Sequence, residues 1–74
     1  MKRFDITLVA AGPTNILWLV LLNRRVVGRL VKTPGKYGFR FYYQKKFFCV
    51  IEETKPAFCI PILKLLIQII KKYE

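Results

Sequence analysis

The residues of this chain that are best suited to chemistry are cations placed among aromatic and aliphatic residues. Arg29, Arg40 and Tyr42 lie in apolar stretches, and Trp18 lies in the apolar stretch before them. Guanidinium groups bind phosphates through paired hydrogen bonds, and aromatic rings stack on nucleobases. These residue types predict a surface for nucleic acid or for an acidic protein. An ordinary solvated sheet face would have the same pattern, because aromatic residues are common in strands.

Side chains for catalysis or metal binding are few. The chain has no histidine, only four acidic residues and only two cysteines. Glu52 and Glu53 are adjacent, and consecutive strand residues point to opposite faces. Without histidine, Cys49 and Cys59 do not complete a structural zinc site; they fit two buried thiols in a cytoplasmic protein, or a disulfide. We therefore expect no enzyme, no metal and no cofactor.

The charge of the chain points to an anionic partner. Fourteen Lys and Arg residues against four Asp and Glu residues give a formal net charge of +10 in 74 residues. Such an excess favours nucleic acid, an anionic membrane surface or an acidic protein. No recognition-helix or RNA-binding motif in the sequence separates DNA from RNA. The residues expected at the contact are Trp18, Arg24, Arg25, Arg29, Lys32, Lys36, Arg40, Tyr42, Lys45 and Lys46.

Apolar runs separated by turn residues predict the strands that would position this contact surface. The predicted strands span about 4–11, 16–22, 26–32, 37–43 and 47–51, with the first at a sheet edge. Three or four of them are expected to form an antiparallel meander. The turns between them are expected at 12–15, at 23–25, where Asn23 tolerates a positive φ, at 33–36 and at 44–46.

Turn length predicts how these strands pair. An even loop about Pro34 places Leu30 opposite Phe39 and Arg29 opposite Arg40, and a turn at Asn23 places Trp18 opposite Arg29. The face expected to form the core carries Leu17, Leu19, Leu21, Val26, Leu30, Phe39, Phe41 and Tyr43. The opposite face carries Trp18, Val20, Val27, Arg29, Arg40, Tyr42 and Gln44.

The C-terminal segment predicts a helix at about 61–73. Lys64, Gln68 and Lys71 recur at helical spacing, and aliphatic residues cover the rest of the surface. Pro61 is expected in the first turn, where its missing N–H costs nothing. The apolar arc is wider than one sheet face needs. The helix is therefore expected to cover the core face, and part of it is available to a protein partner or a membrane.

Together these features predict a single α+β domain over residues 1–74, a small antiparallel β-meander of three to four strands with a C-terminal helix packed on one face. The expected function is that of a non-enzymatic, cytoplasmic nucleic-acid-binding accessory or regulatory protein. One alternative is a regulator or inhibitor of the phage- or plasmid-encoded type that binds a larger host enzyme or assembly. A second alternative is a small membrane-associated subunit. It is disfavoured because Gly12 and Pro13 interrupt the apolar stretch 6–22, which leaves fewer continuous apolar residues than the ~18 that a membrane span needs.

Overall fold

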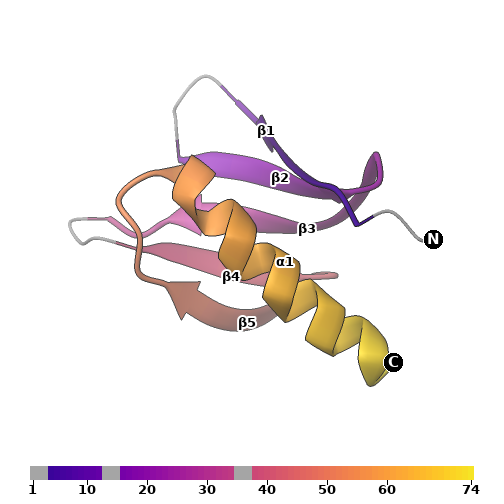
Figure 1. Ribbon diagram of the computed structural model, residues 1–74. Helices are drawn as coiled ribbons and strands as arrows, with labels where there is room; N and C mark the ends of the chain where they lie inside the picture. The colour runs from indigo at the N-terminus through magenta and orange to yellow at the C-terminus, as the bar shows by residue number, and fades with distance from the viewer. Residues whose placement is uncertain (1–3, 13–15, 35–37) are drawn as a thin grey trace.

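The chain folds into one antiparallel sheet with one helix on it (Figure 1). The computed structural model describes residues 4–12, 16–34 and 38–74. The sheet has five strands in the order β1-β2-β3-β4-β5. The elements are β1 (Ile6–Ala10), β2 (Leu17–Leu22), β3 (Arg25–Lys32), β4 (Phe39–Tyr43), β5 (Lys46–Ile51) and α1 (Pro56–Lys72). The predicted α+β meander with a C-terminal helix is confirmed, with five strands rather than three or four. The predicted turn residues 13–15 and 35–36 lie outside the described residues.

Two tight turns connect the hairpins at one end of the sheet. Asn23 and Arg24 have φ values of 50° and 71°, and Gln44 and Lys45 have φ values of 50° and 73°. Two central residues with positive φ form the hairpin turn whose twist matches that of the flanking strands. The prediction that Asn23 adopts positive φ is confirmed. In both turns the second position, where glycine is favoured, holds a cation.

The predicted pairing of β3 with β4 is wrong by two residues. Leu30 pairs with Phe41 and Arg29 pairs with Tyr42, so the two arginines do not lie opposite each other. The reason is a longer connection, which is closed by the Thr33 N–H donating to the Gly38 carbonyl oxygen at 3.0 Å. A shift of two residues leaves every side chain on its predicted face, because side chains alternate with a period of two.

The predicted orientation of β2 is wrong, and a β-bulge is the reason. Leu21 pairs with Val26 as the turn requires, but beyond that point Val20 pairs with Gly28 and Trp18 with Leu30. One extra residue on β3 reverses which face of β2 meets the core. Trp18 and Val20 therefore lie on the helix side rather than on the predicted contact face. Four residues predicted on the core face lie on the opposite face of the sheet: Leu17, Leu19, Leu21 and Val26.

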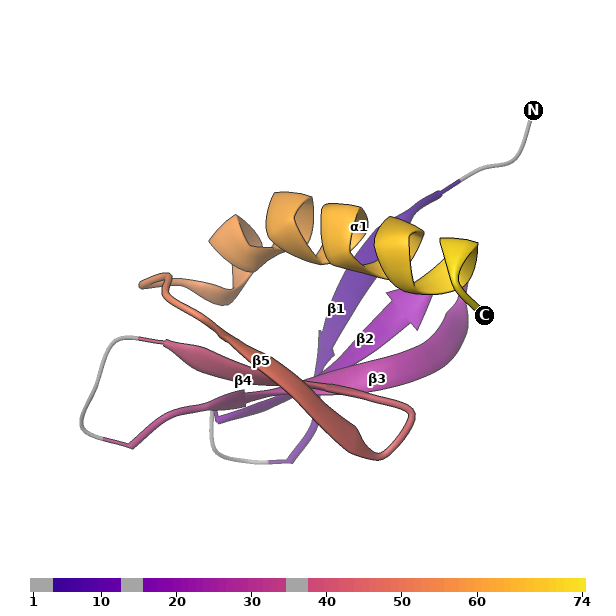
Figure 2. The same ribbon diagram turned by 90° about the horizontal axis from the view of Figure 1, so that it is seen from below.

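The core lies between the sheet and α1 (Figure 2). Trp18 packs against it, with its ring edge-on to Phe39 at 5.5 Å between centroids. Buried side chains come from four strands and the helix, and they are Val20, Leu30, Phe39, Phe41, Tyr43, Ile51, Cys59, Leu63 and Ile67. The predicted core positions Leu30, Phe39, Phe41 and Tyr43 are confirmed.

The helix begins at Pro56 rather than at the predicted Pro61, which lies inside it. Cys59 precedes Leu63 and Ile67 at helical spacing and is buried with them, so the buried stripe starts before the second proline. The last turn is fixed to the sheet by the Tyr43 hydroxyl, which donates to Glu74 Oε1 at 2.8 Å. No helix formed by the described residues has the length and hydropathy to cross a membrane.

Candidate functional site

No described element covers the sheet face opposite α1, which we call the open face (Figure 2). This face is largely apolar, yet it carries two exposed arginines, Arg29 and Arg40. Val26 and Phe47 expose 60% and 55% of their surfaces on it. The residues of the open face are Thr7, Val9, Leu17, Leu19, Leu21, Val26, Arg29, Val31, Arg40, Tyr42, Phe47 and Val50. Apolar side chains left uncovered next to cations are typical of a contact surface.

The centre of the open face is a row of one cation and two rings across β3, β4 and β5. Tyr42 pairs with Arg29 on one side and with Phe47 on the other. The Arg29 Cζ atom lies 5.1 Å from the centroid of the Tyr42 ring, within cation–π range. The Tyr42 and Phe47 rings meet edge to face at 5.7 Å between centroids. These contacts hold the guanidinium and both rings in place beside one another.

Arg40 places a second cation on the neighbouring row. It pairs with Val31 on β3 and with Val50 on β5, and its side chain is exposed. Arg40 and Arg29 are therefore diagonal neighbours on adjacent strands rather than a directly opposed pair.

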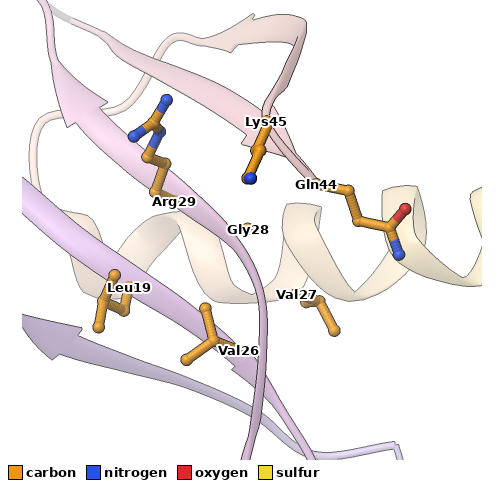
Figure 3. Close-up of a pocket in the computed structure, with 7 residues that line it drawn as sticks. All are labelled: Leu19, Val26, Val27, Gly28, Arg29, Gln44 and Lys45. Carbon is orange, nitrogen blue, oxygen red and sulfur yellow. The ribbon is translucent and has the colours of Figure 1, made fainter.

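A shallow pocket lies beside the bulge of β3, with a volume of about 300 Å³. The cationic ends of Arg29 and Lys45 lie on one side of it, and Leu19 and Val26 lie on the other (Figure 3). Val27, Gly28 and Gln44 complete the lining. An apolar surface with two cations at its rim suits a ligand that has a flat apolar part and a negative charge.

Four further cations gather at one end of the sheet. The β2–β3 and β4–β5 turns lie at the same end, because the strands alternate in direction (Figure 1). Arg24 lies in the first turn and Arg25 begins β3, Lys45 lies in the second turn and Lys46 begins β5, and all four side chains are exposed. Arg24 and Lys45 occupy positive-φ positions, which cost a side-chain-bearing residue about 1 kcal/mol or more. Backbone strain of this kind is often retained at functional sites.

The structure brings together five of the ten residues predicted at the contact. Arg29, Arg40 and Tyr42 share the open face, and Arg24 and Lys45 lie in the turns at its end. Arg25 and Lys46 pair with Leu22 and Tyr43, which pack on the helix side, so the register places these two cations on that side. Trp18 lies on the helix side of the sheet. Lys32 pairs with the buried residue Phe39 at the other end of β3. Lys36 lies outside the described residues.

Phe47 is a member of the central row that the sequence prediction missed. The signal that could have found it is the turn at Gln44 and Lys45, which places Lys46 opposite Tyr43. The next pair is then Tyr42 with Phe47. Treating 44–46 as a three-residue turn hides this pairing.

The two cysteines of the chain are free thiols that are poorly suited to nucleophilic chemistry. Cys59 is fully buried, and its burial together with the nearby charge of Glu53 raises its pKa to about 11. Burial also raises the pKa of Cys49. Both groups are protonated at neutral pH, and a thiol reacts only as the thiolate.

Metal-binding side chains do not cluster either. Over residues 4–12, 16–34 and 38–74, no group of three His, Cys, Asp or Glu side chains could hold a metal ion. The open face offers cations, aromatic rings and apolar side chains. Comparison of the chain with models of known protein families, with curated proteins and with solved structures finds no match.

Proposed function

We propose that this protein binds single-stranded nucleic acid on its open face, as a non-enzymatic accessory or regulatory protein. The observation that carries the proposal is the row of Arg29, Tyr42 and Phe47, with the guanidinium carbon 5.1 Å from the Tyr42 ring centroid. Exposed aromatic rings on an open sheet take up unpaired bases, whereas bases inside a duplex are already stacked.

The open face offers contacts both for the bases and for the phosphates of a nucleic acid. Bases can stack on the exposed side chain of Phe47 or on the Arg29 guanidinium, and the apolar floor of the pocket accepts a base edge. Phosphates can contact Arg29, Arg40 and Lys45, and the strand can continue toward the cations of the hairpin turns. The net charge of +10 supplies the long-range attraction that such binding requires.

The test is the salt dependence of oligonucleotide binding by the double variant Arg29→Gln with Arg40→Gln. Fluorescence anisotropy with labelled twelve-nucleotide oligothymidylate and oligouridylate measures the dissociation constant from low to high salt. Removing two phosphate contacts should weaken binding and flatten the slope of log K against log salt by about 1.4, at about 0.7 per contact on a single strand. The fold should be retained, because both side chains are exposed.

The matched control removes the same charge elsewhere. Lys32→Gln with Lys64→Gln deletes two exposed cations that do not lie on the open face. This control should bind nearly as the parent protein does. Equal losses in the two double variants would mean that binding reflects net charge alone, and the proposed face would then be wrong. Comparison of the two oligonucleotides distinguishes DNA from RNA as the preferred ligand.

A further inference from the structure

The edge of the sheet at β1 has the form of a site for an additional strand. Among the described strands, β1 pairs only with β2. The Asn23 N–H donates to the Asp5 carbonyl oxygen at 3.0 Å, and the Ala11 N–H donates to the Leu17 carbonyl oxygen at 2.9 Å. The backbone N–H and C=O groups of the odd-numbered residues of β1 therefore point toward β2 and bond with it. By the alternation of an antiparallel ladder, Ile6, Leu8 and Ala10 direct theirs outward.

The two edges of this sheet differ in how they are protected. β5 carries Lys46 and an irregular register between Phe47 and Cys49, and both features discourage further pairing. β1 has the uncharged sequence Ile-Thr-Leu-Val-Ala and pairs with β2 without a register shift. A regular, uncharged edge strand is a template for another strand. The edge that is suited to strand addition is therefore β1.

A cleft runs beside this edge, between β1 and the first turns of α1. Its volume is about 580 Å³. It is lined by Ile6, Thr7, Leu8, Ala10, Trp18, Lys55, Pro56, Ala57 and Ile60. All but two of these side chains are apolar. A strand added to β1 would direct every second side chain to the helix side of the sheet, which is where the cleft lies.

The one charged side chain that lines the cleft is a cation. Lys55 is its only charged lining residue, and it directly precedes the first helical residue of α1. The first turn of α1 has no acidic residue, and no side chain caps it. The positive end of the helix dipole thus adds to the charge of Lys55. A carboxylate is the complementary group at this end of the cleft.

We propose that β1 and the cleft bind an extended, acidic segment of a partner protein by strand addition. Backbone hydrogen bonds to Ile6, Leu8 and Ala10 hold the segment. Its apolar side chains enter the cleft at alternate positions, and an acidic side chain meets Lys55. Charge favours this occupant over a second copy of the chain, because each copy carries +10. The site is separate from the open face and does not depend on nucleic-acid binding.

The experiment selects peptides and then removes one backbone donor. A displayed library of random twelve-residue peptides is selected against the full chain, and dissociation constants of the enriched peptides are measured by anisotropy. Ala10→Pro removes an outward N–H at an exposed position without removing a bond to β2. Ala10→Ser keeps this N–H and is the control. Enriched peptides should alternate apolar residues and carry an acid, and Ala10→Pro should bind them at least tenfold more weakly than Ala10→Ser.

A charge reversal tests the acidic end of the segment. Lys55→Glu should weaken peptide binding at least fivefold, and Lys64→Glu, an exposed change elsewhere on α1, should leave it unchanged. The proposal is overturned if no peptide is enriched, or if the enriched peptides bind all four variants alike. It is also overturned if sedimentation shows a dimer that Ala10→Pro abolishes, since a second copy would then occupy the edge. Oligonucleotide binding by Ala10→Pro should equal that of the parent, so failure here is distinct from failure of the open face.

Discussion

Gly28 is the residue at which β3 comes so close to β4 that no side chain fits. A Cβ added at this position would overlap the Tyr42 carbonyl oxygen, and it would lie 3.3 Å from the Phe41 ring. The position is buried and follows the extra residue of the bulge, and the nearest atom belongs to the backbone rather than to a flexible side chain. The glycine is therefore required for packing, independently of any conformational freedom.

We expect Gly28→Ala to lower the free energy of unfolding by about 1–3 kcal/mol, the usual cost of overpacking a buried site. Urea denaturation followed by circular dichroism measures the change. Thr7→Ala, an exposed change on β1, serves as the control and should stay within about 0.5 kcal/mol of the parent. Parent-like stability of Gly28→Ala would contradict the close approach of β3 and β4 at the bulge.

Tyr43 links the stability of the protein to alkaline pH. Burial and the hydrogen bond to Glu74 raise its pKa from 10.0 to about 12. Between these values the unfolded chain loses the phenolic proton and the folded chain keeps it, so stability falls as pH rises. The contribution is fully present below pH 10 and is lost by about pH 12.

Tyr43→Phe should remove this dependence. The variant lacks the hydrogen bond to Glu74 and should be less stable by about 1 kcal/mol at pH 8. Between pH 10 and pH 12, the parent should lose up to about 2 kcal/mol relative to the variant. Denaturant midpoints at pH 8, 10, 11 and 12 give the comparison. A constant difference across these values would show that the Tyr43 hydroxyl does not titrate with a raised pKa.

At the scale of the element, the two hairpin turns combine backbone strain with positive charge. Arg24 and Lys45 have φ values of 71° and 73°, at positions where glycine would be relaxed. Folding alone favours glycine there, whereas a contact with phosphate favours the cation. A change at Lys45 should therefore move stability and binding in opposite directions.

We expect Lys45→Gly to raise the free energy of unfolding by about 0.5–1 kcal/mol, through relief of the positive-φ strain. The same change should weaken oligonucleotide binding and reduce its salt slope by about 0.7, the contribution of one phosphate contact. Lys45→Arg keeps both the charge and the strain, and it should match the parent in both measurements. Tighter or unchanged binding by the glycine variant would exclude Lys45 from the contact.

The strand β2 shows where prediction from local pattern failed. Its six residues, Leu-Trp-Leu-Val-Leu-Leu, are all apolar, so alternation does not tell which side faces the core. The prediction relied on the turn at Asn23, and the turn does set the first pairs correctly. The bulge near Val27 then reverses the faces of the remaining pairs. The predicted position of Trp18 on the contact face is wrong for this reason.

At the scale of the whole molecule, the helix covers one side of the sheet and leaves the other side open. The helix side forms the core, and the open face leaves Arg29 and Arg40 exposed and Tyr42 partly exposed. The net charge of +10 acts over both, and it makes any anionic partner sensitive to salt. The site that we propose at the β1 edge would take a partner strand without covering the open face.

The strand segments, the turn chemistry, the α+β class and the shared face of Arg29, Arg40 and Tyr42 can all be predicted from the sequence. These follow from local causes: alternation with a period of two, and residues that tolerate positive φ. The tertiary structure alone decided which side of β2 is buried, where α1 begins and that Phe47 joins the central row. Each of these depends on packing across the sheet. A bulge of one residue leaves no periodic signal in the chain, and the helical spacing of Cys59 with Leu63 and Ile67 crosses Pro61, which by itself predicts a helix start.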